Sequence, residues 1–117
     1  MKSMQLTNLK EVKVSMTDFR DALWSELHDS DIVEVSVWLI DAKNTITEAI
    51  EYIYDYKSTD DEYKKLGYLS LYDECIQEAI THLENALTML KKANCDENIR
   101  KMVFGHCEYQ ISKLKNF

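Results

Sequence analysis

The residues best placed to do chemistry are carboxylates, and they are concentrated in one segment of the chain. Residues 21–62 contain twelve acidic and two basic residues, although the whole chain of 117 residues has a net charge of only −7. Acidic residues recur there every seven positions, at Glu34, Asp41, Glu48, Asp55 and Glu62. Seven residues make about two helical turns, so the first four of these carboxylates lie on one side of a helix. Such a row attracts a positively charged partner, and it lacks the buried pairing that tunes a carboxyl pKa for catalysis.

Two interpretations of this acidic segment remain open. A charged helix face commonly serves only to keep a protein soluble. Solvated faces usually mix both signs, however, because like charges one turn apart destabilise a helix. Here only Lys43 and Lys57 interrupt the twelve carboxylates. We therefore expect a surface that binds a basic protein, widened by Glu51 and extended by Asp60 and Asp61.

The spacing of the three cysteines predicts neither a metal site nor a bound cofactor. Cys75, Cys95 and Cys107 are 20 and 12 residues apart, and none belongs to a C-x-x-C pair of the kind found in zinc and redox motifs. We expect free thiols in a reducing compartment.

One short pattern near the C-terminus suggests catalysis. Arg100 and His106 enclose five residues in RKMVFGH, and Tyr109 follows one turn later. The pattern resembles the R-x(4 to 6)-H motif of the HEPN superfamily, small all-α proteins that include dimeric ribonucleases of toxin–antitoxin systems. The resemblance implies that Arg100 and His106 meet their symmetry mates in a dimer cleft and promote RNA cleavage.

This resemblance covers only Arg100 to Tyr109. The chain departs from the family pattern at Lys101, where a polar residue such as asparagine is commonest, and at Tyr109, which is three rather than two residues beyond the histidine. Glycine-rich nucleotide motifs and the H-E-x-x-H and G-x-S-x-G signatures are absent from the sequence. We expect no catalytic residues, with the ribonuclease as the alternative.

The composition limits the folds that can position these residues. The sequence has no proline and two glycines, whereas sandwiches, barrels and doubly wound nucleotide folds need many turn residues. Apolar residues make up 45% of the chain, which is enough for a core. We expect an all-α fold, a compact bundle of about four helices built on a long antiparallel hairpin.

Two long helices should form that hairpin, because apolar or small residues alternate at steps of three and four, the spacing of one helix face. The first stripe consists of Ile32, Val35, Leu39, Ala42, Ile46, Ala49, Ile53 and Tyr56. The second consists of Leu69, Tyr72, Ile76, Ala79, Leu83, Ala86, Leu90 and Ala93. Thr59 and Glu62 form a capping box that places a turn at residues 57–60, and Asp31 with Glu34 can cap the first long helix.

Shorter elements are predicted at the two ends of the chain. Residues 1–15 read as an arm, in which Val12 to Ser15 fit an extended conformation, and residues 16–117 as a single helical-bundle domain. Ser15 and Asp18 resemble a capping box for a short helix over residues 16–28. Asp96 can cap a last helix over residues 97–115.

The start of the first long helix is apolar on nearly all sides. Residues 32–40 read IVEVSVWLI, which also fits a strand, but the helical spacing continues beyond them without a break. Such a stretch lies either at the centre of the bundle or under a second chain. In the second case the homodimer interface consists of Ile32, Val33, Val37, Trp38 and Ile40.

Tyrosines gather around the predicted turn. Tyr56 and Tyr72 lie on the apolar stripes and should be buried. Tyr52, Tyr54 and Tyr63 lie off the stripes beside carboxylates, where a tyrosine adds apolar contact area with a polar end. The alternative is that they cover the ends of neighbouring helices. The predicted partner-binding set is Glu34, Asp41, Glu48, Glu51, Asp55, Asp60, Asp61, Glu62, Tyr52, Tyr54 and Tyr63.

The same features disfavour several functions. Net acidity argues against direct DNA binding, and the longest apolar run, Val37 to Ile40, is far shorter than the roughly 20 residues of a membrane span. Residues 1–15 lack the apolar stretch of a secretory signal, so we expect a cytoplasmic location.

The function expected from the sequence is therefore non-enzymatic protein binding. The chain would inhibit or neutralise a basic partner, one that itself binds nucleic acid, by analogy with small inhibitors encoded on phages and mobile elements. A structural, oligomerising subunit is a further alternative.

Overall fold

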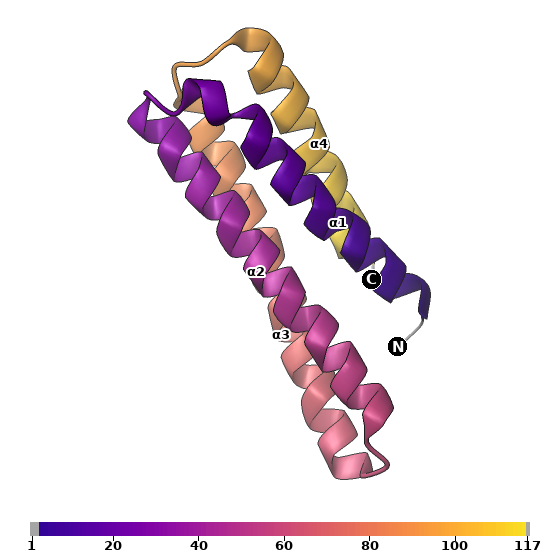
Figure 1. Cartoon of the computed structure of the whole chain (residues 1–117). Helices are drawn as coiled ribbons and strands as arrows, with labels where there is room; N and C mark the ends of the chain where they lie inside the picture. The colour runs from indigo at the N-terminus through magenta and orange to yellow at the C-terminus, as the bar shows by residue number, and fades with distance from the viewer. Residues whose placement is uncertain (1–2, 117) are drawn as a thin grey trace.

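The computed structural model describes residues 3–116, apart from the side chains of residues 3–5 and 25. Over this range the chain forms four α-helices and one short 3-10 helix in an elongated bundle of 51 × 22 × 19 Å (Figure 1). The helices are α1 (Ser3–Ala22), α2 (Ser30–Ser58), α3 (Glu62–Lys92) and α4 (Glu97–Lys115), and the 3-10 helix is Trp24–Glu26. The predicted all-α fold is confirmed.

The long helices α2 and α3 pack against each other as the predicted antiparallel hairpin, α1 packs on α2, and α4 packs on α3 (Figure 1). At 1.5 Å per residue α2 is about 43 Å long and α3 about 46 Å, whereas α1 and α4 are about 30 and 28 Å. The end of the hairpin that contains the α2–α3 turn therefore projects beyond α1 and α4 (Figure 1). We call this end the hairpin tip, residues 54–66.

The apolar stripes of both long helices face the core as predicted. Every stripe residue of α2 from Ile32 to Ile53 is fully buried, and the α3 stripe is buried from Tyr72 to Ala93. Tyr56 and Leu69 are only half-buried, because they lie near the projecting tip. Small residues recur on both stripes, and this allows the two backbones to approach closely along the hairpin.

The structure corrects the prediction of an N-terminal arm over residues 1–15. Residues 3–15 are helical and continue without interruption to Ala22, while residues 1–2 lie outside the described residues. Leu9 and Val12 are fully buried, so this segment packs in the bundle instead of extending from it. The low helix propensity of β-branched residues amounts to tenths of a kcal/mol each, and burial of an apolar side chain outweighs it.

The short helix expected over residues 16–28 is also wrong. Ser15 lies inside α1 and caps nothing, and its hydroxyl accepts a hydrogen bond of 3.3 Å from the amide of Gln110 on α4. The helix ends at Ala22, and the chain then turns through the 3-10 helix towards the start of α2.

Three aspartates form the helix caps. Asp29 accepts hydrogen bonds from the backbone N–H groups of Asp31 and Ile32, so the cap of α2 lies two residues before the predicted cap, Asp31. Asp61, rather than Thr59, caps α3. Asp96 caps α4, and the predicted bounds of that helix, 97–115, are confirmed.

The apolar start of α2 is helical, as preferred, but it is not centrally buried on all sides. Ile32 is fully buried, whereas Val33 and Val37 are 44% and 48% exposed. The reason is geometric: α1 and α3 cover two sides of α2, and the third side faces solvent.

Candidate partner-binding face

One side of α2 faces away from the rest of the bundle and combines apolar and acidic residues. We call it the outer face; its residues are spaced by three or four and are Val33, Val37, Ile40, Asn44, Glu48, Glu51 and Asp55. This spacing places them on one stripe of the helix surface. The first three are apolar and the last three are carboxylates, so the face changes character along its length.

Five carboxylates on or beside this face form the acidic row: Glu34, Asp41, Glu48, Glu51 and Asp55. Asp41 is half-buried and the other four are exposed. Among the side chains that the structure describes, the four ion pairs all lie elsewhere, so no cation neutralises the row. Glu48, Glu51 and Asp55 therefore follow one another on the outer face, whereas Glu34 lines a groove beside α3 with Trp38 and Met89. None of the five has an ion-pair partner among the described side chains.

Glu48 has one polar contact. The buried thiol of Cys75 on α3 lies 3.8 Å from its carboxylate and donates a weak hydrogen bond. Burial, followed by the nearby Glu48 carboxylate, raises the pKa of the Cys75 thiol to about 11. The thiol is thus protonated at neutral pH and leaves the charge of the row intact.

The acidic cluster of the hairpin tip belongs to a different environment. Asp61 accepts hydrogen bonds of 2.9 and 3.1 Å from the backbone N–H groups of Tyr63 and Lys64 as the cap of α3. Glu62 pairs with Lys65 at 3.6 Å. Two of the three predicted tip carboxylates therefore have structural partners, and Asp60 is exposed beside them.

The three predicted tyrosines are not brought together. Tyr52 is half-buried and stacks on Tyr68 of α3 with ring centroids 6.4 Å apart, which matches the alternative that it covers a neighbouring helix. Tyr54 is 47% exposed, and the ammonium of Lys10 on α1 lies 5.8 Å from its ring centroid. Tyr63 is 85% exposed at the tip. Of the set, only Tyr63 presents a largely free ring.

An apolar groove lies at the other end of the outer face, where the turn after α1 meets α2. It has a volume of about 360 Å³. The groove is lined by Arg20, Asp21, Trp24, Leu27, Val33, Ser36, Val37 and Ile40. The sequence pattern indicated Val33, Val37 and Ile40 but not Trp24, which is 75% exposed. Trp24 directly follows Leu23, the buried residue that ends the apolar stripe of α1 and its turn.

One residue of the predicted homodimer interface cannot contribute to it, because Ile32 is fully buried in the core. Trp38 is half-buried, with its ring stacked 5.5 Å from the ring of His82 on α3. Val33 and Val37 are exposed, and Ile40 is half-buried.

Arg100 and His106 are directed to different neighbours. The guanidinium of Arg100 donates hydrogen bonds to the carbonyls of Leu90, Lys91 and Ala93, the unpaired carbonyls at the end of α3, and its Nε donates to Glu97 at 2.9 Å. His106 faces α1, with its ring 5.3 Å from that of Phe19. Within one chain the structure does not bring the two side chains together.

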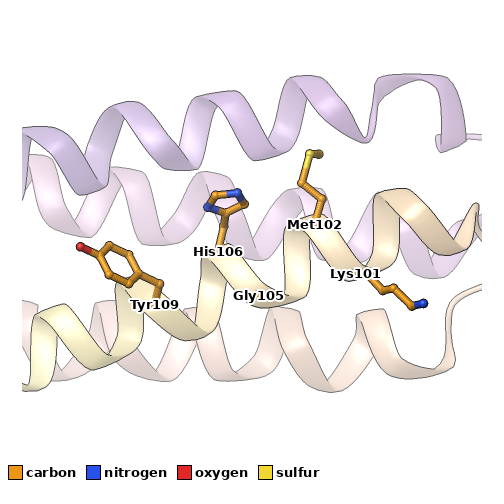
Figure 2. A pocket seen from close by; sticks show the side chains of 5 residues that line it. All are labelled: Lys101, Met102, Gly105, His106 and Tyr109. Carbon is orange, nitrogen blue, oxygen red and sulfur yellow. The ribbon is translucent and has the colours of Figure 1, made fainter.

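His106 lies in a shallow groove with Lys101, Met102, Gly105 and Tyr109. Figure 2 shows His106 and Met102 on the side of α4 that faces α1, whereas Lys101 points the opposite way. Met102 and His106 are both exposed. Among the described side chains, no ion pair includes the imidazole of His106.

The cysteines and the other metal-ligating side chains do not cluster in the described part of the chain. Cys75, Cys95 and Cys107 are free, and no group of three or more metal-ligating side chains comes together. Burial raises the pKa of the Cys107 thiol to about 12. Its thiol is therefore protonated and shielded.

None of the four helices is long and apolar enough to cross a membrane.

The fold and its surface define an all-α helical bundle with an outer face that is apolar at one end and acidic at the other. Comparisons with protein-family models, with curated proteins and with solved structures find no match.

Proposed function

We propose that this protein is a non-enzymatic binding module that captures a basic segment of another protein through the outer face of α2. The observation that carries the proposal is the acidic row, whose five carboxylates have no ion-pair partner among the described side chains. Like charges on one helix destabilise it by tenths of a kcal/mol per pair, so a cationic partner would relieve an existing repulsion.

The geometry favours a lysine- or arginine-rich helix or strand as the bound segment. Glu48, Glu51 and Asp55 are about 4.5 and 6 Å apart along the helix axis, within reach of successive long basic side chains. A partner that uses these cations to hold nucleic acid would be neutralised on binding. The row is sparser than the phosphates of DNA, about one per 1.7 Å, so the proposal is competition for a basic surface rather than full mimicry. Tyr63 and Asp60 extend the contact at the hairpin tip.

A charge reversal tests this proposal. The probe is a helical peptide of about 18 residues composed of lysine and alanine, which spans about 27 Å. Asp41→Lys, Glu48→Lys and Asp55→Lys together should weaken its binding by at least about tenfold in titration calorimetry, because attraction becomes repulsion. Binding to the unmodified protein should also weaken with added salt, which screens exposed charges.

A matched triple variant provides the control. Asp73→Lys, Glu84→Lys and Glu108→Lys alter three exposed carboxylates of α3 and α4 and change the net charge equally. This variant should retain most of the binding. Equal losses in both triple variants would mean that only net charge matters, and they would refute a defined binding face. Affinity capture from the native host, compared across the same variants, then identifies the partner.

A further inference from the structure

The apolar groove beside Trp24 has features of a binding site and not of a chance surface depression. Trp24 is 75% exposed, and Val33 and Val37 are about half exposed, so three large apolar side chains adjoin at one place. Single exposed apolar residues are normal on a soluble protein, but contiguous ones around a concavity mark sites of contact.

Ser36 lines the same groove but adds no polar group that a ligand could reach. It is only 7% exposed, and its hydroxyl oxygen is shielded from solvent. The surface that a bound molecule meets is therefore formed mainly by the apolar side chains around Ser36, which suits an apolar occupant.

The groove is continuous with the acidic row, which indicates the charge of its occupant. Val37 and Asp41 are one turn apart, and Glu48 and Asp55 follow at about 16 and 27 Å from Val37 along the same helix. A ligand long enough to extend from the groove along α2 would meet carboxylates and Asn44, with no cation on the outer face.

We propose that the groove receives the apolar end of the same basic segment, which would be an amphipathic helix with large apolar residues at one end and basic residues along the rest. This inference rests on the proposed function and adds to it the anchor and the direction of the partner. The apolar side chains enter between Trp24 and Val37, and the basic side chains lie over Glu48, Glu51 and Asp55.

Charge argues against a second copy of this chain as the occupant. Arg20, the one cation among the groove-lining residues, is already 3.6 Å from Asp21. The rest of the outer face carries the carboxylates Glu48, Glu51 and Asp55 and no cation. Two copies meeting here would bring these carboxylates together, whereas a basic helix would neutralise them.

Three peptides of equal length and charge test the inference. The first is the lysine–alanine helix used above. The second replaces three alanines at one end, at positions i, i+4 and i+7, with leucine, and the third places the same three leucines on different sides of the helix. The second should bind at least about tenfold more tightly than the third, because burial of even one leucine is worth that factor. It alone should shift tryptophan emission to the blue, and Trp24→Phe should remove that shift.

A groove variant and a matched control complete the test. Trp24→Ser with Val37→Thr should abolish the advantage of the second peptide and leave binding of the first unchanged. Val14→Thr, an isosteric change at a valine 60% exposed on α1, should change neither the advantage of the second peptide nor the binding of the first. Equal binding of all three peptides would overturn this inference and leave the proposed function standing. Failure of every lysine peptide would instead refute the proposed function. Self-association in sedimentation equilibrium that the groove variant abolishes would assign the groove to a second copy and overturn the inference.

Discussion

Arg100 illustrates how one side chain can be given a role by its surroundings. A guanidinium presents several donors in a fixed fork, and here they reach three carbonyls that the end of α3 leaves unpaired. The positive charge also lies at the negative end of the helix dipole. In the HEPN resemblance Arg100 would instead face RNA across a dimer cleft. The contacts observed are those of a residue that joins the end of α3 to the start of α4.

We therefore expect Arg100→Ala to destabilise the fold. The variant loses hydrogen bonds to a partly buried carbonyl cluster, so its free energy of unfolding should fall by about 1–3 kcal/mol. Urea unfolding followed by circular dichroism measures this. Lys101→Ala, at the exposed neighbouring position, is the control and should change stability by less than about 0.5 kcal/mol. Equal stability of the two variants would contradict the capping role.

At the scale of the element, α1 shows how tertiary contacts decide the extent of a helix. The residues Leu9, Val12, Met16, Phe19 and Leu23 recur at three and four and are all buried, so the segment is amphipathic from its first turns. Ser15 and Asp18 fit the local rule for a helix start, yet a helix already in progress satisfies their backbone groups. Ser15 and Asp18 match a capping pattern, but the helix continues through them because residues before Ser15 pack against α2 and α4.

Two valines in α1 distinguish a packed helix from a peripheral arm. Val12 is fully buried and Val14 is 60% exposed. Val12→Ala should lower the free energy of unfolding by about 2 kcal/mol, because it leaves a cavity in the core. Val14→Ala should have an effect below about 0.5 kcal/mol. If thermal unfolding found both changes equally harmless, residues 3–15 would not be part of the cooperative fold.

At the scale of the whole molecule, charge is distributed unevenly over a bundle of uniform construction. Outside residues 21–62 the acidic and basic residues nearly balance, whereas that segment carries a large excess of carboxylates. Four of them, Asp21, Asp29, Asp61 and Glu62, act as caps or ion-pair partners. The acidic row on α2 has no such role, and its mutual repulsion costs stability in the isolated chain.

This repulsion predicts a stabilising effect of salt. Raising the ionic strength from about 0.01 to 0.15 M shortens the Debye length from about 30 to 8 Å. The midpoint temperature of thermal unfolding should therefore rise, and the free energy of unfolding should increase by an amount on the order of 0.5 kcal/mol. The Asp41→Lys, Glu48→Lys and Asp55→Lys variant should lose most of this response, whereas the Asp73, Glu84 and Glu108 control should keep it. The same salt response in both variants would show that the row is not the source of strain.

The sequence by itself determined the parts of this protein that depend on near neighbours along the chain. The apolar stripes from Ile32 to Ile53 and from Tyr72 to Ala93 follow a helical period over many turns, and the missing proline leaves that period unbroken. Such long patterns sum many small preferences in the same direction, so the two helices, their hairpin and the acidic row could be predicted.

Only the tertiary structure decided which exposed residues share a surface. Trp24 and Ser36 are twelve residues apart and on different elements, and nothing local indicates that the turn after Ala22 brings them to one groove with Val37. Tyr52, Tyr54 and Tyr63 are close in sequence, yet packing directs them to three separate places. The physical reason is that contacts between elements depend on helix orientation and on the path of the turns, and these are set by the burial of the whole core at once.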